Sequence, residues 1–139
     1  IGESERLREG HDVALLALGT MVPLALEAAA QLQREGISAR VINARFAKPL
    51  DEKMLLKLAD DDIPVVTIEE GVSQGGFGSA VLEYYARQHI YHMAVQIMGV
   101  PDYFVEHGSV DDQRREVGLT VEGITANARA MTLKRRQRA

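Results

Sequence analysis

The segment that most constrains the fold is I-P-V-V-T-I-E-E-G-V-S-Q-G-G-F-G-S-A-V-L-E-Y-Y, residues 63–85. It begins with a short run of β-branched residues around Pro64, which predicts a strand buried on both faces in the middle of a parallel sheet. Glu69 and Glu70 are expected to end this strand. Three glycines follow, and from Phe77 the apolar residues recur at helical spacing. The segment therefore predicts a strand, a glycine-rich turn and a helix.

The glycine-rich turn has two interpretations. Gly75, Gly76, Gly78 and Ser79 would lie between a strand end and a helix start, where open α/β sheets tend to bind anions through backbone N–H groups. Their spacing fits neither G-x-G-x-x-G nor G-x-x-x-x-G-K-S/T, so it identifies no known phosphate loop. In the alternative, the glycines only let the helix pack close to its strand. Valine at Gly75 or Gly76 would then cost about 1–3 kcal/mol through strain.

The rest of the chain alternates between short apolar runs and segments of helical spacing. Further strands are expected near residues 3–8, 13–18, 37–44 and 93–98. Four more helices are expected to begin at the N-caps Thr20, Asp51, Ser109 and Thr120, and Gly36 and Gly118 are placed to end two of them. The strand–helix–strand order predicts parallel crossover units.

Composition narrows the class of protein. The chain has 139 residues, 46% of them hydrophobic, which suits one domain with a sizeable core. A net charge of −4 gives no reason to expect nucleic-acid binding, and no apolar run has the length of a membrane span. Without cysteine there is no disulfide, thiolate metal site or cysteine nucleophile. Because the chain starts at Ile1 rather than methionine, we expect a fragment of a longer protein.

Several ionisable groups are candidate sites. His89 and His92 have a spacing that could hold a metal ion, but no third ligand accompanies them. The acidic run 60–62 is either a solvated loop or a cation contact. Arg45 and Lys48 are expected to form a structural ion pair with a glutamate at 69–70 rather than a phosphate clamp.

Two further segments are unusual in composition. The loop 101–109 is too apolar at Tyr103 and Phe104 for a free connection, and too polar at His107 to be buried without partners. We therefore expect Tyr103, Phe104 and His107 to contact another domain or subunit. The basic tail 134–139 suits a helix C-terminus and is expected to be a frayed, solvated end, with contact to an anionic surface as the alternative.

Four motifs carry a resemblance to a known family. They are N-A-R-F-A-K-P-L-D (43–51), T-I-E-E-G-V-S-Q-G-G-F-G-S-A-V-L-E (67–83), G-V-P-D-Y-F-V-E-H-G-S (99–109) and G-L-T-V-E-G-I (118–124). Together they resemble the C-terminal, transketolase-type domain of the 1-deoxy-D-xylulose-5-phosphate synthases. The second motif is shared with transketolases and with the β subunits of 2-oxo-acid dehydrogenases, so these remain alternatives, as does a stand-alone anion-binding module. Ala47 departs from the valine expected there.

The resemblance implies a fold and a role. The fold is a three-layer α/β/α domain with a mostly parallel five-stranded sheet and one antiparallel edge strand. The intact family member is a cytoplasmic bacterial or plastid-type homodimer that uses thiamine diphosphate and Mg²⁺ to condense pyruvate with glyceraldehyde 3-phosphate for isoprenoid synthesis. The cofactor and catalytic residues of the family lie in two preceding domains, and no G-D-G…N motif occurs here. We therefore expect no catalytic, cofactor-binding or metal-binding residue in this chain, and no contact with nucleic acid or membrane.

Overall fold

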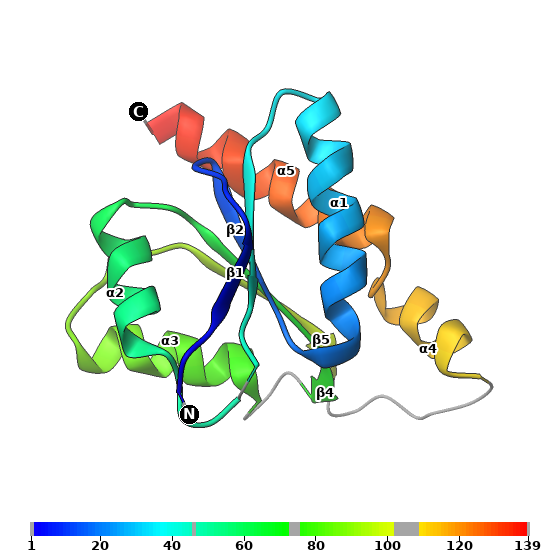
Figure 1. Cartoon of the computed structure of the whole chain (residues 1–139), viewed down its shortest axis with the longest axis horizontal. Helices are drawn as coiled ribbons and strands as arrows, with labels where there is room; N and C mark the ends of the chain where they lie inside the picture. Colours follow the sequence, from blue (N-terminus) through cyan, green and yellow to red (C-terminus); the bar gives the residue numbers. More distant parts are fainter. Residues whose placement is uncertain (1, 46, 73–75, 102–108, 139) are drawn as a thin grey trace.

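The computed structural model describes residues 2–45, 47–72, 76–101 and 109–138, and these ranges form a single α/β domain (Figure 1). The elements in chain order are β1 (Glu5–Arg8), β2 (Val13–Ala17), the 3-10 turn η1 (Gly19–Met21), α1 (Val22–Arg34), β3 (Ala39–Asn43), α2 (Glu52–Asp60), β4 (Val65–Val72), α3 (Phe77–Arg87), β5 (Val95–Val100), α4 (Val110–Val117) and α5 (Val121–Arg138). The predicted alternation of strands and helices is confirmed.

The five strands form one sheet in the order β1-β3-β2-β4-β5. β1 runs antiparallel to β3, and the other neighbours are parallel. β2 lies in the centre and all five of its residues are buried, as its continuous apolar run predicts. The expected mixed sheet with one antiparallel edge strand is therefore confirmed.

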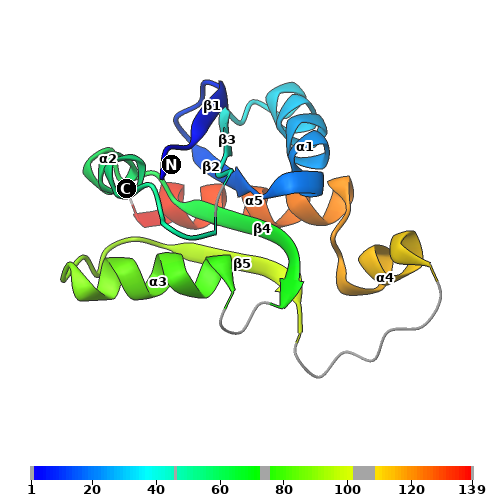
Figure 2. The ribbon, with the colours of Figure 1, turned by 60° about the horizontal axis from the view of Figure 1, so that its bottom comes forward.

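Helices cover both faces of the sheet and enclose two separate cores. In Figure 1, α2 and α3 lie on one side of the strands and α1 on the other, while Figure 2 shows β4 and β5 between α3 and α5. The core under α1 and α5 is built around Leu15, Leu32, Val41, Ile68 and Ile124. The core under α2 and α3 is built around Leu16, Ile42, Leu55, Val65 and Val81. The alternating residues of each buried strand thus supply both cores.

Three of the four predicted N-caps are confirmed. The side-chain oxygens of Asp51, Ser109 and Thr120 accept hydrogen bonds from backbone N–H groups three residues later, at 3.1, 3.1 and 3.0 Å. These bonds satisfy N–H groups that have no partner within the first turn of a helix. Gly36 and Gly118 have φ angles of 80° and 81°, the left-handed geometry expected where α1 and α4 end.

Two local predictions were wrong. Thr20 caps no helix: it lies inside η1, and α1 starts only at Val22 with no side-chain cap. Glu69 and Glu70 do not end β4, which continues to Val72 after a shift of register with β5. The prediction failed because both glutamates have partners within the chain, and a polar residue that is satisfied in this way does not end a strand.

Helix α3 packs directly against the sheet at Gly78, which lies in its first turn. A β-carbon at Gly78 would lie 2.5 Å from Oγ1 of Thr67 on β4 and 2.7 Å from Cγ2 of Ile97 on β5. Gly76 has an ordinary φ of −90°, and Gly75 lies outside the described residues. The structural interpretation of the glycine-rich turn therefore applies to Gly78, because only a residue without a side chain lets α3 pack this closely.

We expect Gly78→Ala to destabilise the domain by about 1–3 kcal/mol, because the added methyl group must displace Thr67 or Ile97. The matched control is Glu83→Ala on the exposed face of the same helix, which should change stability by no more than about 0.5 kcal/mol. Urea unfolding of both variants measures the difference. Equal midpoints for Gly78→Ala and the unchanged chain would contradict the close approach.

Candidate functional site

The candidate site lies at the carboxyl edge of the sheet, where β4 ends and α3 begins. One of the two interpretations of the sequence is an anion-binding turn here, formed by Gly75, Gly76, Gly78 and Ser79. The structure places Gly76 at the N-cap of α3, and Gly78 and Ser79 in its first turn. Gly75 and the predicted contact residues Tyr103, Phe104 and His107 lie outside the described residues.

The carboxylate of Glu69 lies at the N-terminus of α3. One of its oxygens accepts a hydrogen bond from the backbone N–H of Phe77 at 2.8 Å, and the residue is only 7% exposed. Burial raises the pKa of the Glu69 carboxyl, against the opposing effect of hydrogen bonds from the N–H groups of Gly78 and Phe77. The chain thus supplies its own anionic group to the helix end that would attract an external anion.

This internal carboxylate bears on the predicted anion site. An external anion at the start of α3 would compete with Glu69 for the Phe77 N–H and would be repelled by the carboxylate in its charged form. The position of Glu69 favours the structural interpretation of the turn. Anion binding at residues 75–79 stays a prediction.

Glu70 has a different environment, although it is the next residue. Its carboxylate accepts hydrogen bonds from the Thr20 hydroxyl and from the Arg114 guanidinium. The hydrogen bond from Thr20, followed by those from Arg114 and its charge, lowers the pKa of Glu70. The sequence predicts Arg45 or Lys48 as the ion-pair partner of a glutamate at 69–70, whereas the partner found for Glu70 is Arg114. Glu70 therefore connects β4 with η1 and α4.

These contacts form a structural network and contain no set of groups suited to catalysis. Both glutamates bind groups of their own chain, and neither of them has a histidine, lysine or nucleophilic serine among the partners found for it in the described residues. The arrangement orients helices at the carboxyl edge of the sheet.

The described residues do not fit a Mg²⁺–diphosphate site. Within them, no group of three histidine, aspartate or glutamate side chains lies close enough to hold a metal ion. His89 contacts the Tyr91 hydroxyl at 2.9 Å, and His92 contacts the carbonyl oxygen of Ala59 at 3.0 Å. The backbone N–H of Phe77, which could bind a phosphate oxygen, is bonded to Glu69 instead. The described residues therefore provide no set of groups that fits a thiamine diphosphate cofactor.

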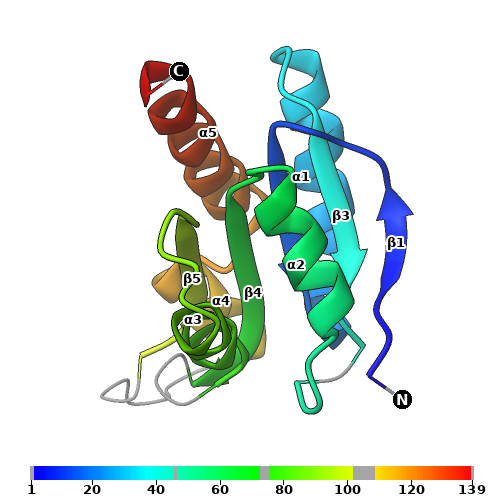
Figure 3. The same ribbon diagram turned by 90° about the vertical axis from the view of Figure 1, so that its left-hand side faces the viewer.

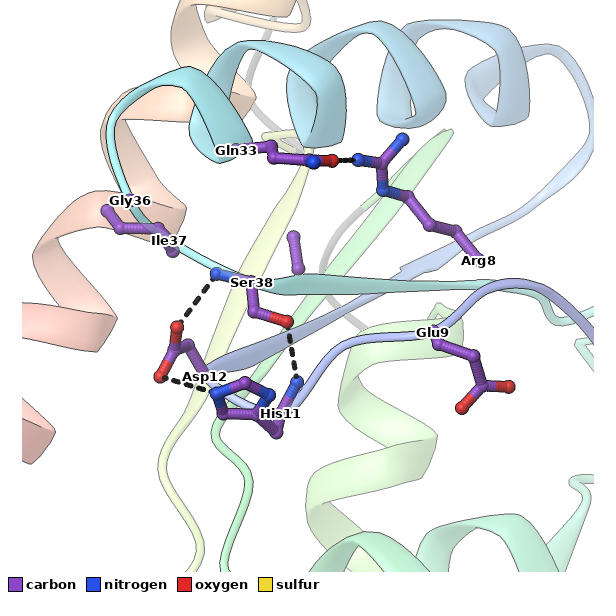
Figure 4. A pocket seen from close by; sticks show the side chains of 9 residues that line it. Arg8, Glu9, His11, Asp12, Gln33, Gly36, Ile37 and Ser38 are labelled. Atoms are coloured by element: carbon purple, nitrogen blue, oxygen red, sulfur yellow. Dashed lines mark hydrogen bonds and ion pairs between the residues drawn. The ribbon is translucent and has the colours of Figure 1, made fainter.

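A hollow of about 410 Å³ lies at the opposite, amino edge of the sheet (Figure 4). Its polar groups bond mainly to one another: the Asp12 carboxylate accepts from the N–H of Ser38 at 2.7 Å, and the Ser38 hydroxyl accepts from the N–H of His11 at 3.2 Å. Arg8 donates to the side chain of Gln33. The sequence places His11 in a turn but gives no signal that these residues meet, because they come from three segments. These hydrogen bonds occupy polar groups at the amino edge of the sheet, and we assign no ligand to the hollow.

Two features of the helices bear on the surroundings of the domain. Of the helices in the described ranges, none is both long and apolar enough to cross a membrane. The basic residues near the chain end belong to α5, where Arg135 donates to the carbonyl oxygen of His11 at 3.1 Å and Arg136 lies 3.8 Å from Asp12. The last turn of α5 therefore contacts the amino edge of the sheet.

Comparison with known proteins assigns this fold to a family. The family described as "Transketolase, C-terminal domain" matches residues 2–124. A solved structure titled "Split gene transketolase, inactive beta4 tetramer" superposes with a TM-score of 0.86 at 38% identity, over 95% of this chain and 43% of that chain. A mutant transketolase from Pichia stipitis has a TM-score of 0.70 at 22% identity, over 95% of this chain and 18% of that chain, and shows the fold alone. The chain belongs to the transketolase C-terminal domain family.

Proteins that are similar in sequence give a more specific comparison than the family does. The 1-deoxy-D-xylulose-5-phosphate synthase of Brevibacillus brevis is 53% identical over 131 residues, which are 94% of this chain and 21% of that protein. The 1-deoxy-D-xylulose-5-phosphate synthase of Shouchella clausii is 52% identical over 139 residues, which are 100% of this chain and 22% of that protein. The chain thus spans about a fifth of the length of these curated relatives and matches their C-terminal part.

The two adjacent glutamates should affect stability in opposite directions as pH changes. A carboxyl group whose pKa is raised on folding, as for Glu69, makes the domain less stable as pH rises above the ordinary pKa of 4.5. A carboxyl group whose pKa is lowered on folding, as for Glu70, stabilises the domain, and this stability is lost as pH falls below 4.5. Relative to the unchanged chain, Glu69→Gln should gain stability as pH rises above 4.5, because glutamine cannot ionise and can still accept the Phe77 N–H.

Glu70→Gln is the matched control, and relative to the unchanged chain it should lose stability as pH rises from acid values toward 4.5, because glutamine cannot gain the charge that Arg114 stabilises. Urea unfolding at a series of pH values measures both variants. Changes of the same sign in the two variants would contradict the assigned environments.

Proposed function

We propose that this chain is the C-terminal domain of a 1-deoxy-D-xylulose-5-phosphate synthase. The observation that carries the proposal is an identity of about 50% that extends over the whole chain, to relatives that bear this name. The motifs at 43–51 and 99–109 also favour the synthase over a 2-oxo-acid dehydrogenase β subunit or a transketolase. A stand-alone anion-binding module is disfavoured, because Glu69 binds the start of α3.

The intact protein would then be a thiamine-diphosphate enzyme of the transferase class. It would join the two-carbon unit of pyruvate to glyceraldehyde 3-phosphate with loss of carbon dioxide, in the cytoplasm or a plastid, as a step of isoprenoid and terpenoid precursor synthesis. Thiamine diphosphate and Mg²⁺ would be held by the preceding domains. None of these steps is assigned to a residue of this chain.

The role proposed for this domain is to complete the fold and the homodimer of that enzyme. The Glu69 and Glu70 contacts support a structural role, since they connect β4 with η1, α3 and α4.

The isolated chain should neither bind thiamine diphosphate nor form deoxyxylulose phosphate, because its described residues offer no metal or diphosphate site. Calorimetric titration with cofactor and Mg²⁺, together with an assay for the product, measures both. The control is a longer protein that contains this chain and the two preceding domains, which should bind the cofactor and turn over. Binding by the isolated chain at about micromolar affinity or better would show that the cofactor site has been misplaced.

We also propose that Tyr103, Phe104 and His107 contact the preceding domains or the second subunit. Phe104→Ala and His107→Ala should then leave the melting temperature of the isolated chain nearly unchanged and weaken the assembly or activity of the intact enzyme. A melting curve of the chain, and sedimentation with a rate assay of the intact enzyme, measure the two effects. Variants that unfold the isolated chain and leave the intact enzyme unaffected would place the segment in an ordinary core.

A further inference from the structure

The two edges of the sheet differ in chemistry. The edge strand β1 has four residues, of which Glu5, Arg6 and Arg8 are charged, and its register with β3 shifts between Arg6 and Arg8. Short length, charge and an irregular register are features that keep a free edge from pairing with another chain. The opposite edge strand, β5, has the sequence V-Q-I-M-G-V, with neither a charged residue nor a proline (Figure 3). Only the β1 edge is protected in this way.

Alternate residues of β5 direct their backbone N–H and C=O groups outward, away from β4. The N–H of Val65 on β4 donates to the carbonyl oxygen of Ala94 at 2.9 Å. In a parallel pair the next residue of the partner strand directs both its backbone groups to the opposite side, so Val95, Ile97 and Gly99 face outward. The side-chain amide of Gln96, at 3.5 Å from the carbonyl oxygen of Ile97, agrees with this direction. No strand in the described part of the chain pairs with this side of β5.

Apolar surface lies beside this edge on both faces of the sheet. On the α3 side, Leu82 is 43% exposed and Ile97 is half-buried. On the other side, a hollow of about 370 Å³ lies between the end of α5 and the start of β5, and is lined by Ala94, Met131, Lys134, Gln137 and Arg138. A row of outward backbone groups with apolar surface on both sides is the kind of edge to which another strand adds.

We propose that β5 pairs antiparallel with β5 of a second copy of this chain, with Ile97 on the two-fold axis. This register places Val95 opposite Gly99 of the other copy, so that the outward N–H and C=O groups of both strands bond to each other. The proposal rests on the homodimer of the proposed function and gives that homodimer a surface. It extends the five-stranded sheet across two subunits.

A second copy fits this edge better than the preceding segment of the same chain. The N–H and hydroxyl of Ser4 donate to Asp51 at 2.8 and 2.7 Å, so the start of the described chain is fixed next to α2 and the β1 edge. In Figure 3 the N-terminus and β5 lie at opposite edges of the sheet. A segment that enters the domain there arrives on the side away from β5.

Because the chain contains no cysteine, a single introduced thiol reports directly on this pairing. Ile97→Cys should form a disulfide-linked dimer under mild oxidation, since residue 97 would face its own copy with Cα atoms about 5.5 Å apart. Val95→Cys is the matched control on the same face of the same strand. Its copy would lie four residues along the strand, roughly 14 Å away, which is too far for a disulfide.

A second pair of variants tests the same surface by measuring, in sedimentation, whether the protein is a monomer or a dimer. Gln96→Lys adds charge to an exposed position on the β5 edge and should sediment as a monomer at concentrations where the unchanged chain is a dimer. Leu7→Lys makes a similar change on β1, where residue 7 is 38% exposed, and should leave the dimer intact. Circular dichroism establishes that each variant is folded, and Gln96→Lys decides the question if Ile97→Cys does not fold.

Two results would overturn the proposal. One is a folded Ile97→Cys variant that cross-links no faster than Val95→Cys, and the other is a Gln96→Lys variant that is as dimeric as the unchanged chain. Both readouts are independent of activity. In a longer protein with synthase activity, absence of the Ile97 cross-link overturns this pairing and leaves the proposed function standing. A longer protein that contains the two preceding domains and cross-links at residue 97, but has no synthase activity, overturns the function and leaves the pairing.

Discussion

Strand β4 is buried on both faces from Val65 to Ile68, and the two glutamates that follow this stretch are held by contacts within the chain. Glu69 is buried and needs a partner within the chain, whereas Glu70 is partly exposed and is held by a hydrogen bond and an ion pair. Glu69 finds one at the start of α3, and Glu70 finds two, on η1 and α4. Two consecutive side chains, pointing to opposite sides of one strand, thereby fix the positions of three other elements.

The contacts of the two glutamates give each carboxylate a structural role. Adjacent carboxylates at the carboxyl edge of a parallel sheet are where an active site would be sought in many α/β proteins. Here burial and backbone N–H groups determine the state of Glu69, while Thr20 and Arg114 determine that of Glu70. Carboxylates committed to internal hydrogen bonds position helices, and this is the structural role that the contacts of both glutamates support.

How much the sequence predicts depends on how far apart the interacting residues are. The N-caps at Asp51, Ser109 and Thr120 are predictable because each bond spans only three residues. The bonds of Glu70 to Thr20 and Arg114 span 50 and 44 residues, and no local pattern shows them. For this reason the sequence assigns Thr20 to a cap and gives the glutamates the wrong role in the strand. Glycine spacing likewise indicates a tight turn without showing that Gly78 is the residue pressed against β5.

The packing of the last helix against the first has a consequence for how the domain is made. Arg129 on α5 bonds to Glu35 at the end of α1 across 94 residues, and Ala128 on α5 belongs to the same core as Ala29 on α1. The other face of the sheet is covered by α2 and α3, which are synthesised earlier. During translation, the α1 side of the sheet stays only partly covered until residues 121–138 have emerged from the ribosome, so the domain can complete its fold only after its last helix is made.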